Sequence, residues 1–435
     1  MTHLVGHFLA FVLIMVCGLH TIFAQTQTLH YDGVDPAHVS IPQLFVYGNH
    51  WDLGYQIGVN FRKQIQFRVR KLNSIDILTE WVEGSPEGTA AYDSFVRANN
   101  DTFPEYFEEL KAMAAGAEVS FKDLFLLNLR NEFLNAMDPG GMGKGKRRHL
   151  EEEGDEGEGC NDCLVDHCSD YLMMDEAGYP FLGHNEDGDI YSRGTAFFVW
   201  GRVEGPDGAV RENSTFLALT YPGELPSNAL FVNSHGVACS MNGLYPAETL
   251  TGGLGRNFLS RDLLGARDER DALRRLSFPN QSTGHHFNLI FPPGAHGGDW
   301  ALRSVEVAPA PGGGRAPGCC RSPARLYYAN GYQVLEVAEC PGRVVSTAHR
   351  LAAAARHAVD PGRGWEGVRE VLGDASDPEY PIYRTHAGPD SSYTLLTALF
   401  RAPEGKLEVL LANPARAEGL RSRFTLDLSP LFEDP

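Results

Sequence analysis

The stretch that decides the fold runs from residue 166 to residue 187 and reads DHCSDYLMMDEAGYPFLGHNED. It holds two short runs rich in apolar and aromatic residues, Tyr171–Met174 and Tyr179–Leu182, separated by a polar turn that ends at Gly178. Glycine accepts the positive φ angles that tight turns between antiparallel strands need. The segment is therefore predicted to be a β-hairpin, with Cys168 just before its first strand.

The hairpin places a thiol beside a polar cluster. If the turn is centred between Glu176 and Ala177, the antiparallel pairing brings Cys168 opposite Asn185. The segment Gly183–Asp187, which contains an imidazole, an amide and carboxylates, then lies next to the thiol. Such neighbours tune the ionisation of a cysteine, so Cys168 is a candidate nucleophile and Asn185 a candidate catalytic neighbour.

The rest of the chain divides into a helical first part and a strand-rich second part. From Phe45 to about Met137 the patterns are mainly helical, and Gly54 and Gly58 lie one turn apart, which leaves a small face for close approach of another backbone. After Leu164 the pattern changes to short strands separated by turns, with helices between some of them. This order predicts an α+β fold in which sheets pack against helices.

Two capping boxes predict helix starts within the first part. Thr102 with Glu105 and Ser120 with Asp123 have the spacing at which a hydroxyl caps the backbone three residues on and a carboxylate reaches back. Each pair therefore predicts the first turn of a helix.

One segment has too few apolar residues to build a core. Asp138–Asp162 contains a Gly-Gly pair, a basic cluster at Lys144–Arg148 and an acidic run at Glu151–Glu158. Charge runs of this kind stay solvated, so a disordered insert is predicted over residues 138–162. The basic cluster fits either a plain solvated charge run or a processing-protease site.

The N-terminus has the form of a secretory signal peptide over residues 1–24. Phe8–Val16 is an unbroken apolar run, too short to span a bilayer, and the small residue Ala24 offers a cleavage site. We therefore expect a secreted or lumenal protein, with the lysosome among the compartments that it can reach. Sequons that fit a glycoprotein begin at Asn100, Asn213 and Asn280.

The cysteine count points to a free thiol. Of the eight cysteines, Cys17 would be lost with the signal peptide, and the remaining number is odd. In an oxidising compartment at least one thiol is then unpaired. Cys160 and Cys163 suit a local disulfide, and Cys168 is either a disulfide partner of one of them or the reactive thiol. Cys239 lies in an apolar strand and is expected to be inert.

Charge and residue spacing argue against several classes of partner. The net charge of −19 argues against nucleic acid and anionic membranes as partners, and no membrane partner is expected. His285-His286 precedes an apolar strand and is expected to serve ordinary packing, and no second cysteine pair follows Cys160 and Cys163 at zinc-finger spacing. No cofactor and no metal ion are therefore predicted.

Short motifs between Gly54 and Val237 carry a resemblance that covers nearly all of the chain beyond the signal peptide. They are Gly54–Gly58 (GYQIG), Phe103–Leu110 (FPEYFEEL), Asn128–Phe133 (NLRNEF), Cys168-Ser169, Gly183–Asp187 (GHNED) and Asn233–Val237 (NSHGV). In order and spacing the chain resembles the family that contains isopenicillin-N acyltransferase (acyl-CoA:6-aminopenicillanic acid acyltransferase) and β-alanyl-dopamine hydrolase. These are cysteine N-terminal-nucleophile hydrolases.

The resemblance implies a four-layer αββα sandwich and a precursor that cuts itself before Cys168. The products would be a helical N-terminal (alpha) chain, residues 25–167, and a nucleophile-bearing (beta) chain, residues 168–435. A free α-amine has a pKa of about 7.7–8.0, so the amine of Cys168 can take the proton of its own thiol near neutral pH. The thiolate then attacks an amide carbonyl and forms an acyl-enzyme.

The resemblance also implies roles for three further residues. Asp187 would orient the α-amine, and Asn242 would donate a hydrogen bond to the oxyanion. Arg384 lies where the family keeps a late arginine near the nucleophile. The chain departs from the family in having His167 before the nucleophile instead of glycine, Ala348 in place of an asparagine, and a longer charged insert upstream of the cut.

The predicted activity is hydrolysis of a linear amide that joins a small acyl or β-alanyl group to an amine, through an acyl-enzyme on Cys168. Acyl transfer to a second amine is one alternative. The other is a family member that has lost catalysis and serves as a secreted binding glycoprotein, which His167 and Ala348 would favour. The expected partners are a small-molecule amide and the cleaved N-terminal chain itself.

Overall fold

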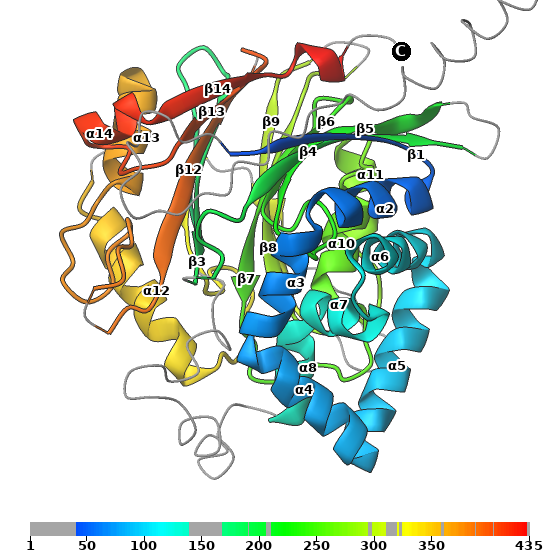
Figure 1. Ribbon diagram of the computed structural model, residues 1–435. Helices are drawn as coiled ribbons and strands as arrows, with labels where there is room; N and C mark the ends of the chain where they lie inside the picture. Colours follow the sequence, from blue (N-terminus) through cyan, green and yellow to red (C-terminus); the bar gives the residue numbers. More distant parts are fainter. Residues whose placement is uncertain are drawn as a thin grey trace, which may run out of the picture.

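The structure is a computed structural model, and it combines helices with two β-sheets (Figure 1). It describes residues 41–138, 168–189, 191–205, 210–294, 298–309, 320–321, 324–357, 361–387, 389–402 and 404–432. The predicted α+β class is confirmed. The predicted signal peptide, the predicted insert apart from Asp138, and His167 lie outside the described residues. Within those residues, no helix is both long enough and apolar enough to span a bilayer.

The N-terminal part supplies one strand and then a layer of helices. Its elements are β1 (Gln43–Gly48), α2 (His50–Asn60), α3 (Arg62–Lys71), α4 (Asn73–Gly84), α5 (Pro86–Thr102), α6 (Pro104–Ala117), α7 (Phe121–Asn128) and α8 (Arg130–Met137). The predicted cap at Ser120 is confirmed, because its hydroxyl accepts from the backbone N–H of Asp123 at 3.0 Å. The predicted cap at Thr102 is wrong: Thr102 ends α5, and α6 begins at Pro104 without a side-chain cap.

The first sheet has eight strands and includes β1. Its order is β1, β4 (Phe197–Glu204), β5 (Val210–Thr220), β6 (Leu230–Asn233), β7 (Ala238–Leu244), β8 (Gly284–Phe291), β9 (Ala301–Val307) and β10 (Cys320–Arg321). β1 pairs with β4 in parallel, whereas the other pairs are antiparallel. The first strand of the described residues is thus part of a sheet otherwise built by residues after Cys168.

The second sheet has six strands and contains the predicted hairpin. Its order is β11 (Arg325–Tyr328), β2 (Ser169–Met174), β3 (Pro180–Gly188), β12 (Tyr393–Arg401), β13 (Lys406–Leu410) and β14 (Arg423–Asp427). The further α-helices of the described residues are α10 (Arg256–Leu263), α11 (Glu269–Leu276), α12 (Pro341–Ala354), α13 (Trp365–Leu372) and α14 (Ala417–Arg421). The hairpin prediction is therefore confirmed, and β2 and β3 lie in the interior of this sheet.

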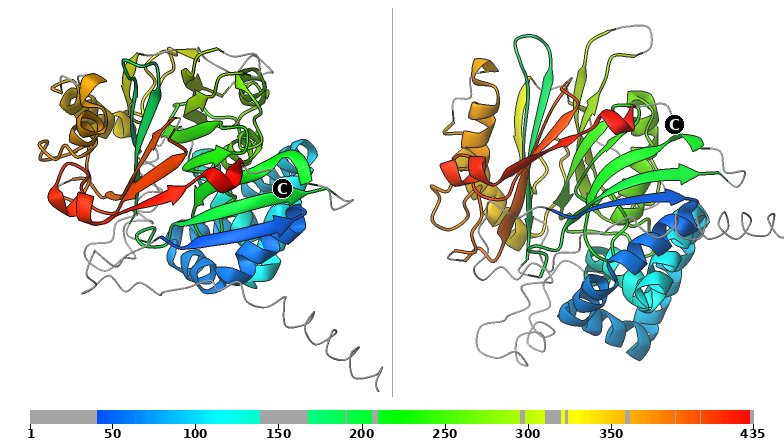
Figure 2. Two further views of the ribbon diagram at one scale, coloured as in Figure 1. Left: turned by 90° about the horizontal axis from the view of Figure 1, so that it is seen from above. Right: turned by 45° about the horizontal axis from the view of Figure 1, so that its top comes forward.

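Successive side chains of a strand point to opposite faces of its sheet. The two sheets therefore contribute to three apolar cores, one between them and one on the outer face of each. Phe197 of β4 packs with the N-terminal helices, whereas its neighbour Phe198 packs between the two sheets. In β2, Leu172 belongs to the core between the sheets and Tyr171 to a third core with α13. Figure 2 shows the result, with the two sheets side by side and helices on the outer face of each.

The glycine pair predicted to allow close approach lies at the contact between α2 and α6. A Cβ at Gly54 would be 1.9 Å from the carbonyl oxygen of Glu109, and one at Gly58 would be 2.3 Å from that of Met113. Since neither oxygen can move without moving α6, only glycine permits this spacing.

Candidate active site

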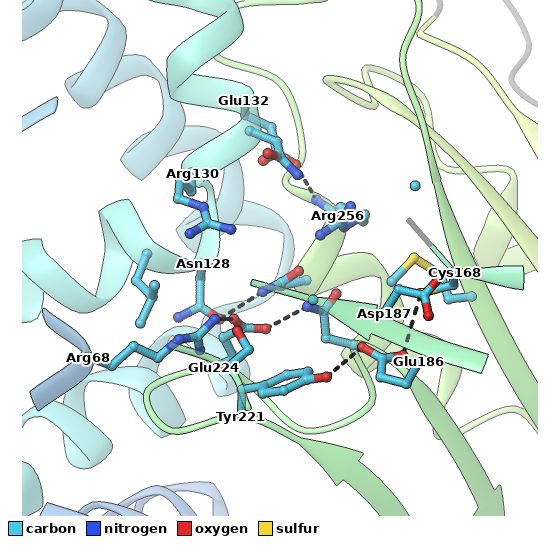
Figure 3. A pocket seen from close by; sticks show the side chains of 18 residues that line it. Arg68, Asn128, Arg130, Glu132, Cys168, Glu186, Asp187, Tyr221, Glu224 and Arg256 are labelled. Carbon is cyan, nitrogen blue, oxygen red and sulfur yellow. Dashed lines mark hydrogen bonds and ion pairs between the residues drawn. The ribbon is translucent and has the colours of Figure 1, made fainter. Parts of the chain in front are cut away.

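Cys168 lies immediately before β2 and is a free, buried thiol. The structure therefore contradicts the alternative in which Cys168 forms a disulfide. Its side chain lines a cavity between the helical layer and the sheets. Figure 3 shows the other labelled lining residues, which are Arg68, Asn128, Arg130, Glu132, Glu186, Asp187, Tyr221, Glu224 and Arg256. The cavity is strongly polar.

The hairpin register differs by one residue from the prediction. Ser169 pairs with Asn185 and Asp170 with His184, so the position opposite Cys168 belongs to Glu186. A shift of one residue reverses which side chains share a face. The thiol accordingly lies 3.5 Å from Oε2 of Glu186.

Asn185 is not brought to the thiol. Its amide Nδ2 donates to the carbonyl oxygen of Leu372 at 2.8 Å, and its Oδ1 accepts from the hydroxyl of Thr397 at 2.7 Å. These contacts lie on the side of the sheet that faces α13. The prediction that Asn185 lies opposite Cys168 is therefore wrong. The contacts of Asn185 are those of a structural side chain.

A buried charged network surrounds the thiol. His184 bonds Asp170 through Nδ1 at 2.9 Å and Glu186 through Nε2 at 2.7 Å, and the hydroxyl of Tyr221 donates to Glu186 at 2.8 Å. Burial lowers the pKa of His184, but the charge of Asp170 and the hydrogen bonds to its neighbours raise it well above its ordinary value. The raised pKa favours the protonated form of His184, in which both ring nitrogens donate to the neighbouring carboxyl groups.

The thiol keeps its proton in this environment. Burial raises the pKa of Cys168 to about 12, the charge of Glu186 adds to that increase, and His184 opposes it. The thiolate is the nucleophilic form of a cysteine. Cys168 consequently needs a nearby base before it can attack a carbonyl.

Asp187 has one carboxylate oxygen without a hydrogen-bond partner in the described structure. Its Oδ1 accepts from the hydroxyl of Thr394 at 2.7 Å, whereas Oδ2 is buried and lies 3.9 Å from Nη1 of Arg384. Burial raises the pKa of Asp187 to about 8, although Arg384 and Arg350 act to lower it. Arg384 itself is held by Asp390, to which its Nε donates at 2.8 Å.

The side-chain amide of Asn242 has an N–H donor that makes no hydrogen bond with the described residues. Its Oδ1 accepts from His286 Nδ1 at 3.1 Å and from Asn288 Nδ2 at 3.3 Å, while its own Nδ2 is buried without a partner among the described residues. It shares a face of β7 with Ser240, whose hydroxyl bonds Asp170 of β2. Its neighbours Met241 and Gly243 line the same cavity as Cys168, whereas Asn242 itself is not among the residues that line it.

Arg350 of α12 is a site residue that sequence reasoning missed. It is fully buried and donates from Nη1 to the carbonyl oxygen of Cys168 at 2.9 Å and to the hydroxyl of Ser169 at 3.0 Å. Its Nη2 donates to Asn330 Oδ1 at 2.8 Å, and Asn330 in turn donates to the carbonyl of Gly243 at 3.0 Å. The only local signal is an arginine in an alanine-rich helix.

Three donor atoms at the site could together hold a metal ion. The sulfur of Cys168, an imidazole nitrogen of His184 and a carboxylate oxygen of Glu186 all lie within 4.8 Å of one another. Thiolate, imidazole and carboxylate are the donor types that zinc accepts in proteins. An ion bound there would occupy the thiol rather than leave it free to react.

Comparison with known proteins adds two findings. The family described as acyl-coenzyme A:6-aminopenicillanic acid acyl-transferase matches residues 173–416. The beta-alanyl-dopamine/carcinine hydrolase of Drosophila melanogaster is 24% identical over 392 residues, which cover 88% of this chain and 96% of that protein. The similarity to this hydrolase extends over both the helical part and the strand-rich part.

Proposed function

The chain belongs to the acyl-coenzyme A:6-aminopenicillanic acid acyl-transferase family, and from that premise we propose that it is an autoprocessed amide hydrolase with Cys168 as its nucleophile. The predicted family resemblance is confirmed. The family and the similar hydrolase together indicate an enzyme of the hydrolase or acyltransferase type that acts on amides. The nucleophile, the cut and the substrate are our proposal.

The observation that carries the proposal is a buried, protonated thiol in the same cavity as Asp187, one of whose carboxylate oxygens has no hydrogen-bond partner among the described residues. A thiol with a pKa of about 12 needs a base. A cut between His167 and Cys168 would provide one, because it frees an α-amine with a pKa of about 7.7–8.0 on the same residue. The unpartnered Oδ2 of Asp187 would then accept a hydrogen bond from that amine.

The reaction would proceed in two steps. The α-amine takes the proton of the thiol, the thiolate attacks the amide carbonyl, and the α-ammonium returns the proton to the leaving amine. The buried N–H of Asn242 is the donor proposed for the oxyanion. Water, activated by the same α-amine, then hydrolyses the acyl-enzyme and restores the thiol.

The succession of helices, sheet, sheet and helices supports the proposal that the fold is the αββα N-terminal-nucleophile sandwich. On this reading residues 25–167 and 168–435 are the two mature chains. We also propose passage through the secretory pathway, with the lysosome as one destination. The sequon asparagine Asn280 is exposed, so a glycan there would meet solvent.

The proposed substrate is a linear amide of a small acyl or β-alanyl group with an amine. The described relative acts on beta-alanyl-dopamine and carcinine according to its name, which favours this class. Acyl transfer to a second amine is the second candidate, because the family description is that of an acyl-transferase. The two differ only in whether water or an amine resolves the acyl-enzyme.

The first test is the covalent state of the purified chain. Intact mass and N-terminal sequencing should show two chains, the second beginning at Cys168, and Cys168→Ala should remain uncut and inactive. Cys239→Ala is the matched control, because Cys239 is also a buried free thiol but is not part of the cavity lining. It should be cut and active as the parent is.

A second measurement separates hydrolase from transferase. A panel of N-acyl and β-alanyl amines is turned over with and without a second amine, and the acyl products are quantified. Free acid in both conditions supports hydrolysis, whereas a new amide supports transfer. An uncut chain whose turnover survives Cys168→Ala would overturn the proposal, and an inactive chain that binds amides would favour the binding-protein alternative.

A further inference from the structure

Arg130, the first residue of α8, places a buried positive charge in the same cavity as Cys168. Only 8% of it is exposed, and its Nη1 has no hydrogen-bond partner among the described residues. The guanidinium forms no ion pair with any residue that the structure describes. Since an arginine stays charged in proteins, a buried guanidinium without a counter-charge is unfavourable.

Arg68 and Arg261, two other buried arginines of the described structure, have carboxylate partners. Arg68 bonds Glu224 at 2.5 Å and the carbonyl oxygen of Pro222 at 3.1 Å. Arg261 binds Glu109 through two nitrogens, at 3.0 and 2.9 Å. Arg130 differs from them in having no carboxylate partner among the described residues, and because it lines the cavity, a ligand there can reach it.

The charges around Arg130 favour an anion at this end of the cavity. Glu224 is neutralised by Arg68, and Oε1 of Glu132 accepts from the backbone N–H of Arg256 at 2.7 Å. The side chain of Arg256 lines the same region and adds a second positive charge (Figure 3). Arg130 therefore lacks a counter-charge among the described residues at this end of the cavity.

We propose that the substrate carries a carboxylate that binds Arg130 while its amide carbonyl reaches Cys168. This inference rests on the proposed function and names the class of amide that the site accepts. A guanidinium binds a carboxylate through two parallel hydrogen bonds, which adds orientation to affinity. Arg130 comes from the helical side of the cavity and Cys168 from the sheet side, so a spacer separates the carboxylate from the scissile amide (Figure 3).

Two kinds of amide share this chemistry, and the test distinguishes them. An N-acyl amino acid carries the carboxylate on its amine part, and a dicarboxylic acid monoamide carries it on its acyl part. Each is compared with an analogue in which the carboxylate is a carboxamide. We expect kcat/KM of the wild-type enzyme to favour one of the carboxylates by about 10- to 100-fold, mainly through KM, as for hydrogen bonds to charged groups.

Arg130→Met should remove this preference, because kcat/KM should fall more for the carboxylate than for the carboxamide. Arg130→Lys should retain part of the preference. The exposed Arg97→Met is the control and should keep the wild-type preference. Arg130→Met should also raise the melting temperature of the ligand-free chain, because it removes an unpaired buried charge. A wild-type enzyme without carboxylate preference, or an Arg130→Met variant that keeps it, would overturn the inference.

Binding to the uncut Cys168→Ala chain separates this inference from the proposed function. An N-acyl amino acid or a dicarboxylic acid monoamide should raise the melting temperature of that chain but not of Cys168→Ala/Arg130→Met. Such binding supports the carboxylate site even if Cys168 proves not to be the nucleophile. Equal shifts in the two chains would overturn the site even if the amidase activity is present.

Discussion

At the residue scale, Asp187 is the group whose ionisation the proposed cut would change. In the uncut chain burial raises its pKa to about 8, and one of its oxygens has no hydrogen-bond partner within the described part of the chain. A new ammonium group on Cys168 would supply both a donor and a positive charge, and each lowers the pKa of a carboxyl group. The cut would therefore convert Asp187 from a largely protonated to an ionised side chain at neutral pH.

The first prediction concerns Asp187→Asn in an uncut Cys168→Ala chain. The folded chain keeps the proton of Asp187 up to about pH 8, whereas the unfolded chain releases it near the ordinary pKa of 3.8. The free energy of unfolding of the parent therefore contains a contribution that is present at low pH and is lost as pH rises towards 8. The variant should gain stability relative to the parent over that range, as measured by urea unfolding at about pH 5, 7 and 9. A pH-independent difference would contradict the raised pKa.

The second prediction concerns Arg350, which holds the backbone of the nucleophile. Arg350→Met removes donors to the carbonyl of Cys168, to Ser169 and to Asn330. Displacement of the nucleophile should slow both self-cleavage and amide turnover by about 10- to 100-fold, mainly in kcat. Arg350→Lys should restore part of the rate.

The exposed Arg356→Met serves as the control for Arg350, because it lies just beyond the same helix. Circular dichroism and melting temperature show whether each variant is folded. A folded Arg350→Met chain with the cleavage rate and kcat of the parent would rule out the positioning role.

Sequence reasoning found part of this site, for physical reasons that differ between residues. Cys168 and the segment with Asp187 are close in sequence and joined by a hairpin, so local pattern places them together. The predicted register was wrong by one residue, so Glu186, and not the predicted Asn185, lies beside the thiol. Arg350 reaches Cys168 from a helix far along the chain, and no local pattern predicts such a contact.

At the scale of elements, the contact between α2 and α6 depends on glycine. The third prediction is that Gly54→Ala destabilises the fold by about 2–3 kcal/mol, since its Cβ would meet the backbone of Glu109 at 1.9 Å and the two helices would have to separate. Gly84→Ala is the matched control, because nothing lies within 4 Å of its Cβ position. It should change stability by no more than about 1 kcal/mol. Equal effects in urea unfolding would contradict the close helix contact.

Elements were predicted well where local signals decide them and poorly where distant contacts do. The hairpin, the glycine face and the Ser120 cap each follow from a few neighbouring residues. The parallel pairing of β1 with β4 joins Phe45 to Trp200 and has no local signal. The Thr102 cap failed because α5 continues through Thr102 and α6 begins without a side-chain cap.

At the scale of the whole molecule, the two parts on either side of the proposed cut are packed into one core. β1 completes the eight-stranded sheet, and the helices from α2 to α8 cover one of its faces. Phe61 of the first part stacks on Phe197 of the second with ring centroids 3.6 Å apart. Buried ion pairs also cross between the parts, from Glu109 to Arg261 and from Arg68 to Glu224.

The last prediction follows from this shared core: the two mature chains should remain associated after the cut. Losing either chain would expose a sheet face and the apolar side of the helices to water, at about 25 cal/mol for each Å² of apolar surface. Size-exclusion chromatography should therefore give one peak at the mass of the uncut Cys168→Ala chain, while a denaturing gel of that peak shows two bands. Urea should release the chains only together with loss of secondary structure, because they unfold as a unit. Separation of the fragments in native buffer would mean that the contacts across the cut do not hold the molecule together.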